Sequence, residues 1–132
     1  MEARDGEEST PLHLASAFSD VEMANLLLEH GASVKCRDSE GSIALHTAAA
    51  FGKTEIVRVL IDAGSDFNAV DGSGNTPLHV SAGSGQIEVI RLLIMKGADV
   101  CAVNKEGLTP YRCAEVFGHR EVVQCLEERM AE

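Results

Sequence analysis

The sequence predicts an all-α fold in which four copies of one helix-pair unit stack in a row. The first observation behind this prediction is a strict repeat of 33 residues, and the second is that each copy contains two short helical segments. The third is a composition that is 45% hydrophobic but only 4% aromatic. A core built from Leu, Ile, Val and Ala suits helices that pack closely against one another.

The repeat is carried by several residue types in one register. His13, His46 and His79 are 33 residues apart, and three glycine series keep the same step. Independent series that share one phase predict a single repeat domain over residues 1–132. The glycines are Gly31, Gly64 and Gly97; Gly41, Gly74 and Gly107; and Gly52, Gly85 and Gly118. The repeats are residues 5–37, 38–70, 71–103 and 104–132.

The third repeat shows how the first helix of each unit is expected to form. Thr76 is a suitable N-cap, and Pro77 suits the first helical position, where its missing N–H costs nothing. The pattern therefore predicts a helix over 77–84. Gly85 can take the left-handed conformation that ends a helix.

A second helix is predicted over 87–96, and Gly97 ends it. Residues 98–107 are expected to be extended and turn-like before the next repeat begins. Helices this short are marginal alone, so each pair must bury its apolar face on a neighbour. The residues expected on that face are Ile87, Ile90, Leu93 and Ile94.

The other repeats depart from this pattern in informative ways. Ile43 replaces the capping threonine in the second repeat, and Ser42 is expected to cap the helix instead. Arg112 replaces the histidine in the last repeat, whose sequence ends in "CLEERMAE". A polar outer side predicts a C-terminal cap. The first repeat is as apolar as an internal one, so either a short N-terminal repeat begins at Met1 or the array is longer.

These motifs together resemble those of the ankyrin-repeat family. The resemblance rests on the 33-residue period, on Thr-Pro-Leu-His at 10–13 and 76–79, and on Gly-Ala-Asp-Val at 97–100. It implies antiparallel helix pairs, β-hairpin loops that project to one side, and a concave face formed by the loop tips and first helices. It also implies that Asn68 matches a hairpin asparagine that is hydroxylated in some members.

The histidines are interpreted as structural residues. Each would lie in the first turn of a helix, where its ring can bond loop backbone and the next repeat. A metal site is not expected, because no His or Cys lies one helical turn from any of them. A catalytic role is not expected either, because no nucleophile recurs beside them. The structural motif residues are Thr10, His13, His46, Thr76, His79 and Thr109.

The phenylalanines indicate a binding surface. Phe18, Phe51 and Phe117 share one repeat position, which Ser84 occupies in the third repeat. By the resemblance this position lies on the concave face. The rings would form an exposed apolar ladder, or each would fold onto a neighbouring helix; the sequence leaves both open. The predicted binding residues are Phe18, Phe51, Ser84, Phe117, Glu7, Ser39, Glu40, Ser73, Lys105 and Glu106.

The net charge of the chain limits the classes of partner that it is expected to bind. The formal net charge is −10, which argues against nucleic acid and against an anionic membrane surface. Acidic loop tips, including Asp38 and Asp71, are either a solvated edge or a site for a basic or mixed-charge protein segment. Four cysteines without metal or redox spacing suggest a reducing compartment, the cytoplasm or nucleus.

The sequence therefore predicts a monomeric, non-catalytic protein-interaction module without a cofactor. Two alternatives stay open: a regulatory or targeting segment of a larger enzyme or channel, and a small protein similar to the ankyrin-type kinase inhibitors. Those inhibitors shorten the first helix of their second repeat, whereas "SIALHTAAAFG" here is full length.

Overall fold

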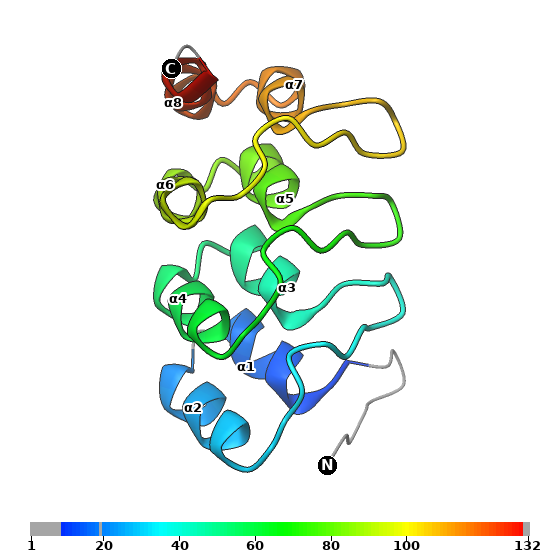
Figure 1. Cartoon of the computed structure of the whole chain (residues 1–132), viewed down its shortest axis with the longest axis vertical. Coiled ribbons are helices and arrows are strands. Elements are labelled where there is room, and N and C mark those ends of the chain that lie inside the picture. The colour runs from blue at the N-terminus through cyan, green and yellow to red at the C-terminus, as the bar shows by residue number, and fades with distance from the viewer. Residues whose placement is uncertain (1–8, 19, 131–132) are drawn as a thin grey trace.

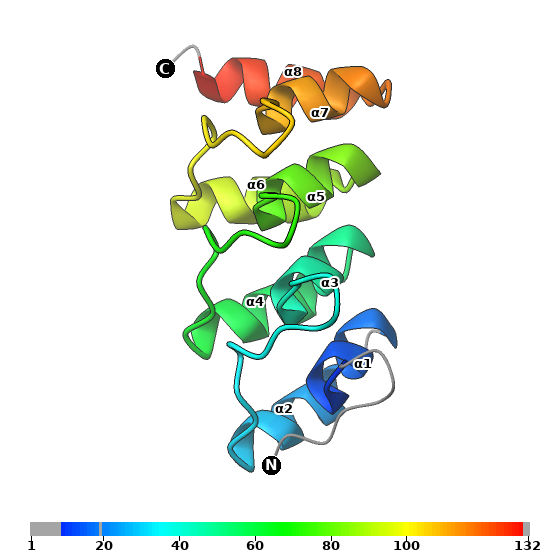
Figure 2. The same cartoon turned by 90° about the vertical axis from the view of Figure 1, so that its right-hand side faces the viewer.

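The computed structural model describes residues 9–18 and 20–130, and in this part of the chain all regular structure is helical. Within these residues, eight helices form four antiparallel pairs stacked in a single row, with the long loops on one side (Figures 1 and 2). The helices are α1 Pro11–Phe18, α2 Val21–Glu29, α3 Ala44–Ala50, α4 Thr54–Asp62, α5 Pro77–Ser84, α6 Ile87–Lys96, α7 Pro110–Val116 and α8 Arg120–Met130. The predicted all-α solenoid is confirmed.

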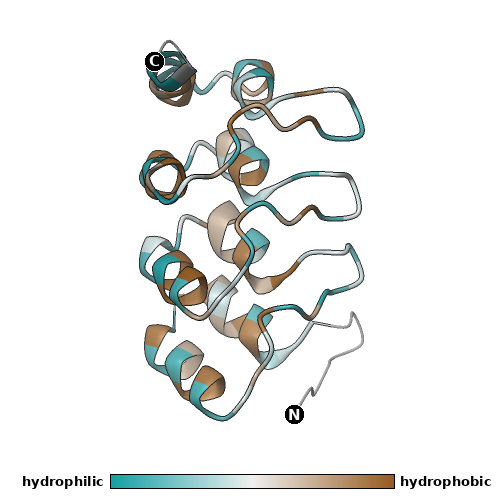
Figure 3. Ribbon diagram, in the orientation of Figure 1, coloured by the Kyte–Doolittle hydropathy of each residue, from teal (hydrophilic) through white to brown (hydrophobic). Residues whose placement is uncertain are grey.

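Packing follows the order of the chain. The first helices α1, α3, α5 and α7 contact one another in sequence, and the second helices α2, α4, α6 and α8 do the same. Each helix carries apolar and polar residues side by side (Figure 3). One continuous core therefore runs the length of the stack, and no pair has a core of its own.

The helix ends form for the reasons the sequence suggests. The Thr76 hydroxyl accepts a hydrogen bond from the His79 N–H at 3.2 Å, which satisfies a donor of the first turn. Gly85 ends α5 with φ of 73°, a left-handed conformation that costs glycine nothing. The predicted first and last residues of α5 and of α6 are confirmed.

One local prediction is wrong and another is incomplete. The N-cap of α3 is Ile43, which makes no side-chain cap hydrogen bond, and Ser42 does not replace it. The Ser42 N–H instead donates to Asp38 Oδ1 at 3.0 Å, so this residue belongs to the loop turn. The buried face of α6 is also wider than predicted, because α6 packs between α4 and α8. Val89 and Leu92 are buried with Ile90 and Leu93, whereas Ile87 and Ile94 are partly buried.

The projecting loops are hydrogen-bonded turns, and no strand is assigned to them in the described residues. In the second repeat the Asp38 N–H donates to the Ser42 carbonyl at 2.9 Å. Neighbouring loops are joined by single backbone bonds, Gly72 N–H to Glu40 O and Lys105 N–H to Ser73 O, both at 3.0 Å. The expected β-hairpins are therefore present as turns without a ladder, because a ladder needs several paired bonds.

Candidate functional site

The three motif histidines link each repeat to the next. Nε2 of His13 lies 2.7 Å from the Ser42 carbonyl, and Nε2 of His79 lies 2.8 Å from the Leu108 carbonyl. His46 makes the same link with the Asn75 carbonyl at 2.9 Å. The predicted bond to loop backbone of the adjoining repeat is thus present at all three positions.

The other ring nitrogen fixes the tautomer of these side chains. Nδ1 of His79 accepts the Thr76 N–H at 3.1 Å, so the Nε2–H must donate to the Leu108 carbonyl. Burial lowers the pKa of His46 and of His79 below the ordinary value of 6.5. Both rings are therefore neutral at physiological pH, and they add no positive charge to their surroundings.

Arg112 takes the histidine position in the last repeat and behaves differently. Its side chain is exposed and pairs with Glu115 within the same helix. Thr109 keeps its capping role, since its hydroxyl accepts the Arg112 N–H at 3.2 Å. The Tyr111 hydroxyl donates to Glu127 at 2.9 Å, and this bond raises the pKa of Tyr111 to about 12.

A groove of about 530 Å³ runs between the loops and the first helices of the last three repeats. Phe51 and Phe117 line it from the C-terminal ends of α3 and α7, and Ser84 lines it at the end of α5. Phe51 is 57% exposed and Phe117 is 64% exposed, so neither ring is folded into the core. Both rings are therefore largely exposed, although the Phe117 ring also lies beside Gly83 of the neighbouring helix α5.

The groove is acidic. Every charged residue among the described residues that line it is an aspartate or a glutamate: Asp38, Glu40, Asp71 and Glu106. His46 and His79 also line the groove, but burial keeps them neutral. A cationic side chain would meet negative charge along the groove, and a phenyl ring in the first or the last of the three repeats that line it.

Two of these acids also build the loops. Asp38 Oδ1 accepts the Glu40 N–H at 2.9 Å and the Ser42 N–H at 3.0 Å. Asp71 and Asn104 make the same pair of bonds in the next two loops. Sequence reasoning assigned Asp38 and Asp71 only to an acidic edge. Their recurrence three residues before a repeat glycine was the signal for a turn-forming role.

Some predicted binding residues lie elsewhere. Phe18 is 77% exposed but does not line the groove, nor do the exposed loop residues Ser39, Ser73 and Lys105. Glu7 lies outside the described residues. The fourth phenylalanine, Phe67, is partly buried against the core. The structure thus brings together five of the predicted residues: Phe51, Ser84, Phe117, Glu40 and Glu106.

Further cross-repeat bonds were missed by sequence reasoning. Gln86 Nε2 donates to the Ala50 carbonyl at 3.2 Å, and His119 Nε2 lies 3.0 Å from the Gly83 carbonyl, one repeat later. Arg37 donates to the Val70 carbonyl at 2.6 Å. Gln86 and His119 occupy the same repeat position, but they are different residue types, so the 33-residue spacing alone could not show that both bond the preceding repeat.

Asn68 also connects two repeats. Its Oδ1 accepts the Asp99 N–H at 3.0 Å, and its own N–H donates to Asp66 Oδ1 at 2.9 Å. The residue is exposed at the loop surface. Hydroxylation of Asn68 remains a prediction.

Sequence comparison supplies the family. The chain matches the family described as ankyrin repeats (3 copies), over residues 1–71 and again over residues 45–132. The chain belongs to the ankyrin-repeat family. Ankyrin repeats are generally protein–protein interaction modules. No curated protein matches this chain.

Two structural observations bear on other site types. Within the described ranges, no three His, Cys, Asp or Glu side chains gather in a way that could hold a metal ion. None of the helices described is long and apolar enough to cross a membrane. All four cysteines of this ankyrin-repeat chain are thiols, and burial raises the pKa of the Cys113 thiol.

Proposed function

We propose that this ankyrin-repeat chain is a non-catalytic interaction module whose groove binds a basic or mixed-charge segment of another protein. The observation that carries the proposal is the combination of two exposed phenyl rings with a lining whose charged residues are all acidic. The module acts as a monomer in the cytoplasm or nucleus.

An arginine-containing segment suits the groove better than an apolar one. A guanidinium can stack on the face of Phe51 or Phe117 and also bond a carboxylate such as Glu40. Charge complementarity would raise the association rate, and added salt would reduce it. The stacked repeats present these residues on a rigid surface, so little conformational entropy is lost on binding.

The first test uses affinity purification with matched baits. The baits are the wild-type chain, Phe51→Ala and Phe18→Ala. The Phe18 variant is the control, because Phe18 occupies the same repeat position but lies outside the groove. Partners should be lost from the Phe51→Ala bait and kept by the control, while both variants keep the wild-type melting temperature, because both rings are exposed.

The second test measures binding directly. Fluorescently labelled peptides of basic, neutral and acidic composition are titrated with the chain, and anisotropy reports binding. Glu40→Lys should weaken binding of basic peptides, whereas Glu128→Lys, an exposed change outside the groove, should not. Equal losses in both variants would show that net charge acts alone, and binding of acidic peptides would contradict the proposed chemistry.

A further inference from the structure

The first repeat exposes apolar residues at positions that the later repeats bury. Met23 is 42% exposed, whereas its equivalents Ile56, Val89 and Val122 are at most 1% exposed. Leu26 is 47% exposed, whereas its equivalent Leu92 is 3% exposed and the other two equivalents, Val59 and Cys125, are partly buried. The difference lies in the position along the stack and not in side-chain chemistry, because all of these residues are apolar.

A comparison of the first and last helix pairs shows which neighbouring repeat covers these positions. Val122 lies in the last described pair, which only the preceding pair contacts, and it is 1% exposed. Met23 lies in the first pair, which only the following pair contacts, and it is exposed. This position therefore faces the preceding repeat. The neighbouring position behaves in the opposite way, since Ala24 is fully buried and Val123 is only partly buried.

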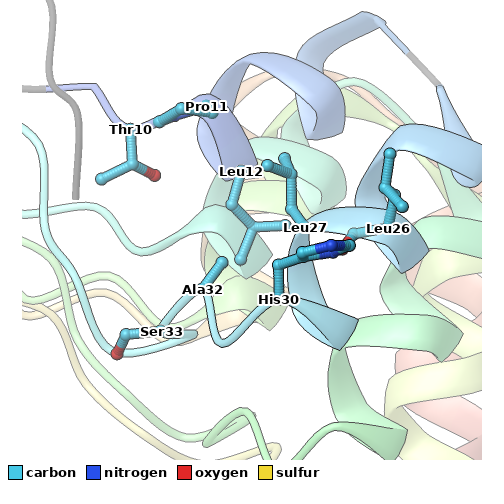
Figure 4. Close-up of a pocket in the computed structure, with 8 residues that line it drawn as sticks. All are labelled: Thr10, Pro11, Leu12, Leu26, Leu27, His30, Ala32 and Ser33. Carbon is cyan, nitrogen blue, oxygen red and sulfur yellow. The ribbon is translucent and has the colours of Figure 1, made fainter. Parts of the chain in front are cut away.

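The residues around Leu26 form a defined hollow. It has a volume of about 200 Å³, and α1, α2 and the loop that follows α2 surround it (Figure 4). Pro11 and Ala32 are partly exposed here, whereas Ala44 and Ala98 at the equivalent positions are buried. The lining residues are Thr10, Pro11, Leu12, Leu26, Leu27, His30, Ala32 and Ser33.

The opposite end of the stack differs from this face. Glu127 is exposed in α8 at the position that Leu28, Ile61 and Ile94 occupy in the other repeats. Its carboxylate accepts the Tyr111 hydroxyl. The face that would meet a following repeat therefore carries a charge, whereas the face that would meet a preceding repeat carries Met23 and Leu26. Only the face that would meet a following repeat has the polar character of a terminal repeat.

We propose that the Met23–Leu26 face binds one further helix pair of the same repeat type, docked in the register of the stack. The interface it would form continues the contacts of α2 with α4, α4 with α6 and α6 with α8. A second copy of the chain suits this face less well. A head-to-tail copy would place its polar C-terminal end, with the exposed Glu127, against this apolar face. The inference does not depend on the groove.

The test adds a repeat to the chain. Residues 1–4 are replaced by a copy of residues 38–70, which keeps the 33-residue register up to Asp5. The added pair should dock on the face and raise the urea midpoint of unfolding by roughly 1 M. The matched variant carries Met23→Glu and Leu26→Glu in both the original and the extended chain.

The double substitution distinguishes docking on this face from a general effect of the added residues. It should lower the midpoint of the 132-residue chain only slightly, because Met23 and Leu26 are already 42% and 47% exposed there, and it should abolish the gain in the extended chain. No gain on extension, or the same loss in both chains, would overturn the proposal. Light scattering of the original chain supplies the third outcome: a dimer that the double substitution dissociates would make a second copy the occupant and refute this inference.

Discussion

Replacing His79 by leucine tests the bond that joins the third repeat to the fourth. The ring is 2% exposed, and leucine is close enough in size to keep the space filled. The change removes the bond from Nε2 to the Leu108 carbonyl and the Nδ1 acceptor of the Thr76 N–H. The Leu108 carbonyl keeps the Asn104 N–H at 3.0 Å, and the Thr76 hydroxyl loses its 2.9 Å contact with Nδ1 but still accepts the N–H of residue 79. The Thr76 N–H is therefore the group left without a partner.

The expected loss can be worked from these contacts. The cross-repeat bond contributes about 1 kcal/mol, and a buried N–H without a partner costs about 2 kcal/mol. The more apolar leucine side chain offsets roughly 1 kcal/mol of this loss. The free energy of unfolding of His79→Leu should therefore fall by about 2 kcal/mol, or roughly 6–10 °C in melting temperature for a domain of this size.

The assay is urea unfolding followed by far-ultraviolet circular dichroism, with Arg112→Leu as the matched control. Arg112 holds the same repeat position but is exposed, and it pairs only within its own helix. This control should change the free energy of unfolding by less than about 0.5 kcal/mol. Equal losses in the two variants, or no loss in His79→Leu, would refute the link across the repeats.

Two further predictions follow from the histidines and the loop glycines. Burial lowers the pKa of His46 and His79, so the unfolded chain binds more protons than the folded chain just below pH 6.5. The contribution of the two rings to the free energy of unfolding is therefore full above that pH and declines as the pH falls below it. Urea unfolding across this range should show a smaller decline in a His46→Leu/His79→Leu variant; an unchanged decline would exclude the two rings as its source. Gly31 and Gly41 have φ of 89° and 78°, and alanine costs about 1 kcal/mol at either. Urea unfolding should show a larger loss of stability for Gly41→Ala than for Gly31→Ala. A Cβ at residue 41 would lie 2.7 Å from the Gly72 nitrogen, whereas a Cβ at residue 31 would have no atom within 4 Å. Equal losses would show that the loop backbone shifts to remove the clash.

Features that depend on residues close in sequence were predictable. Thr76 and Gly85 mark the ends of α5 because capping and left-handed termination are local. The 33-residue period indicated that His13, His46 and His79 have one role, so their link to the next repeat could be inferred before any contact was known.

The candidate site was only partly predictable, because a period assigns equivalent positions but does not say what each position faces. Phe18 and Phe51 are equivalent in sequence, yet only Phe51 lines the groove. Asp71 was expected at an acidic edge, and the structure shows that it also holds a loop turn through two backbone N–H groups. The first outcome depends on where along the stack a residue lies, whereas the turn at Asp71 is local and its sequence signal was not used.

By itself, the sequence determined the repeat and the helices, because these follow from local backbone chemistry repeated at a constant spacing. Tertiary structure decided the width of each buried face, the composition of the groove and the exposure of Met23 and Leu26. The physical reason is that burial depends on the neighbours on both sides of a helix pair, and the first pair is contacted only from the side of the second.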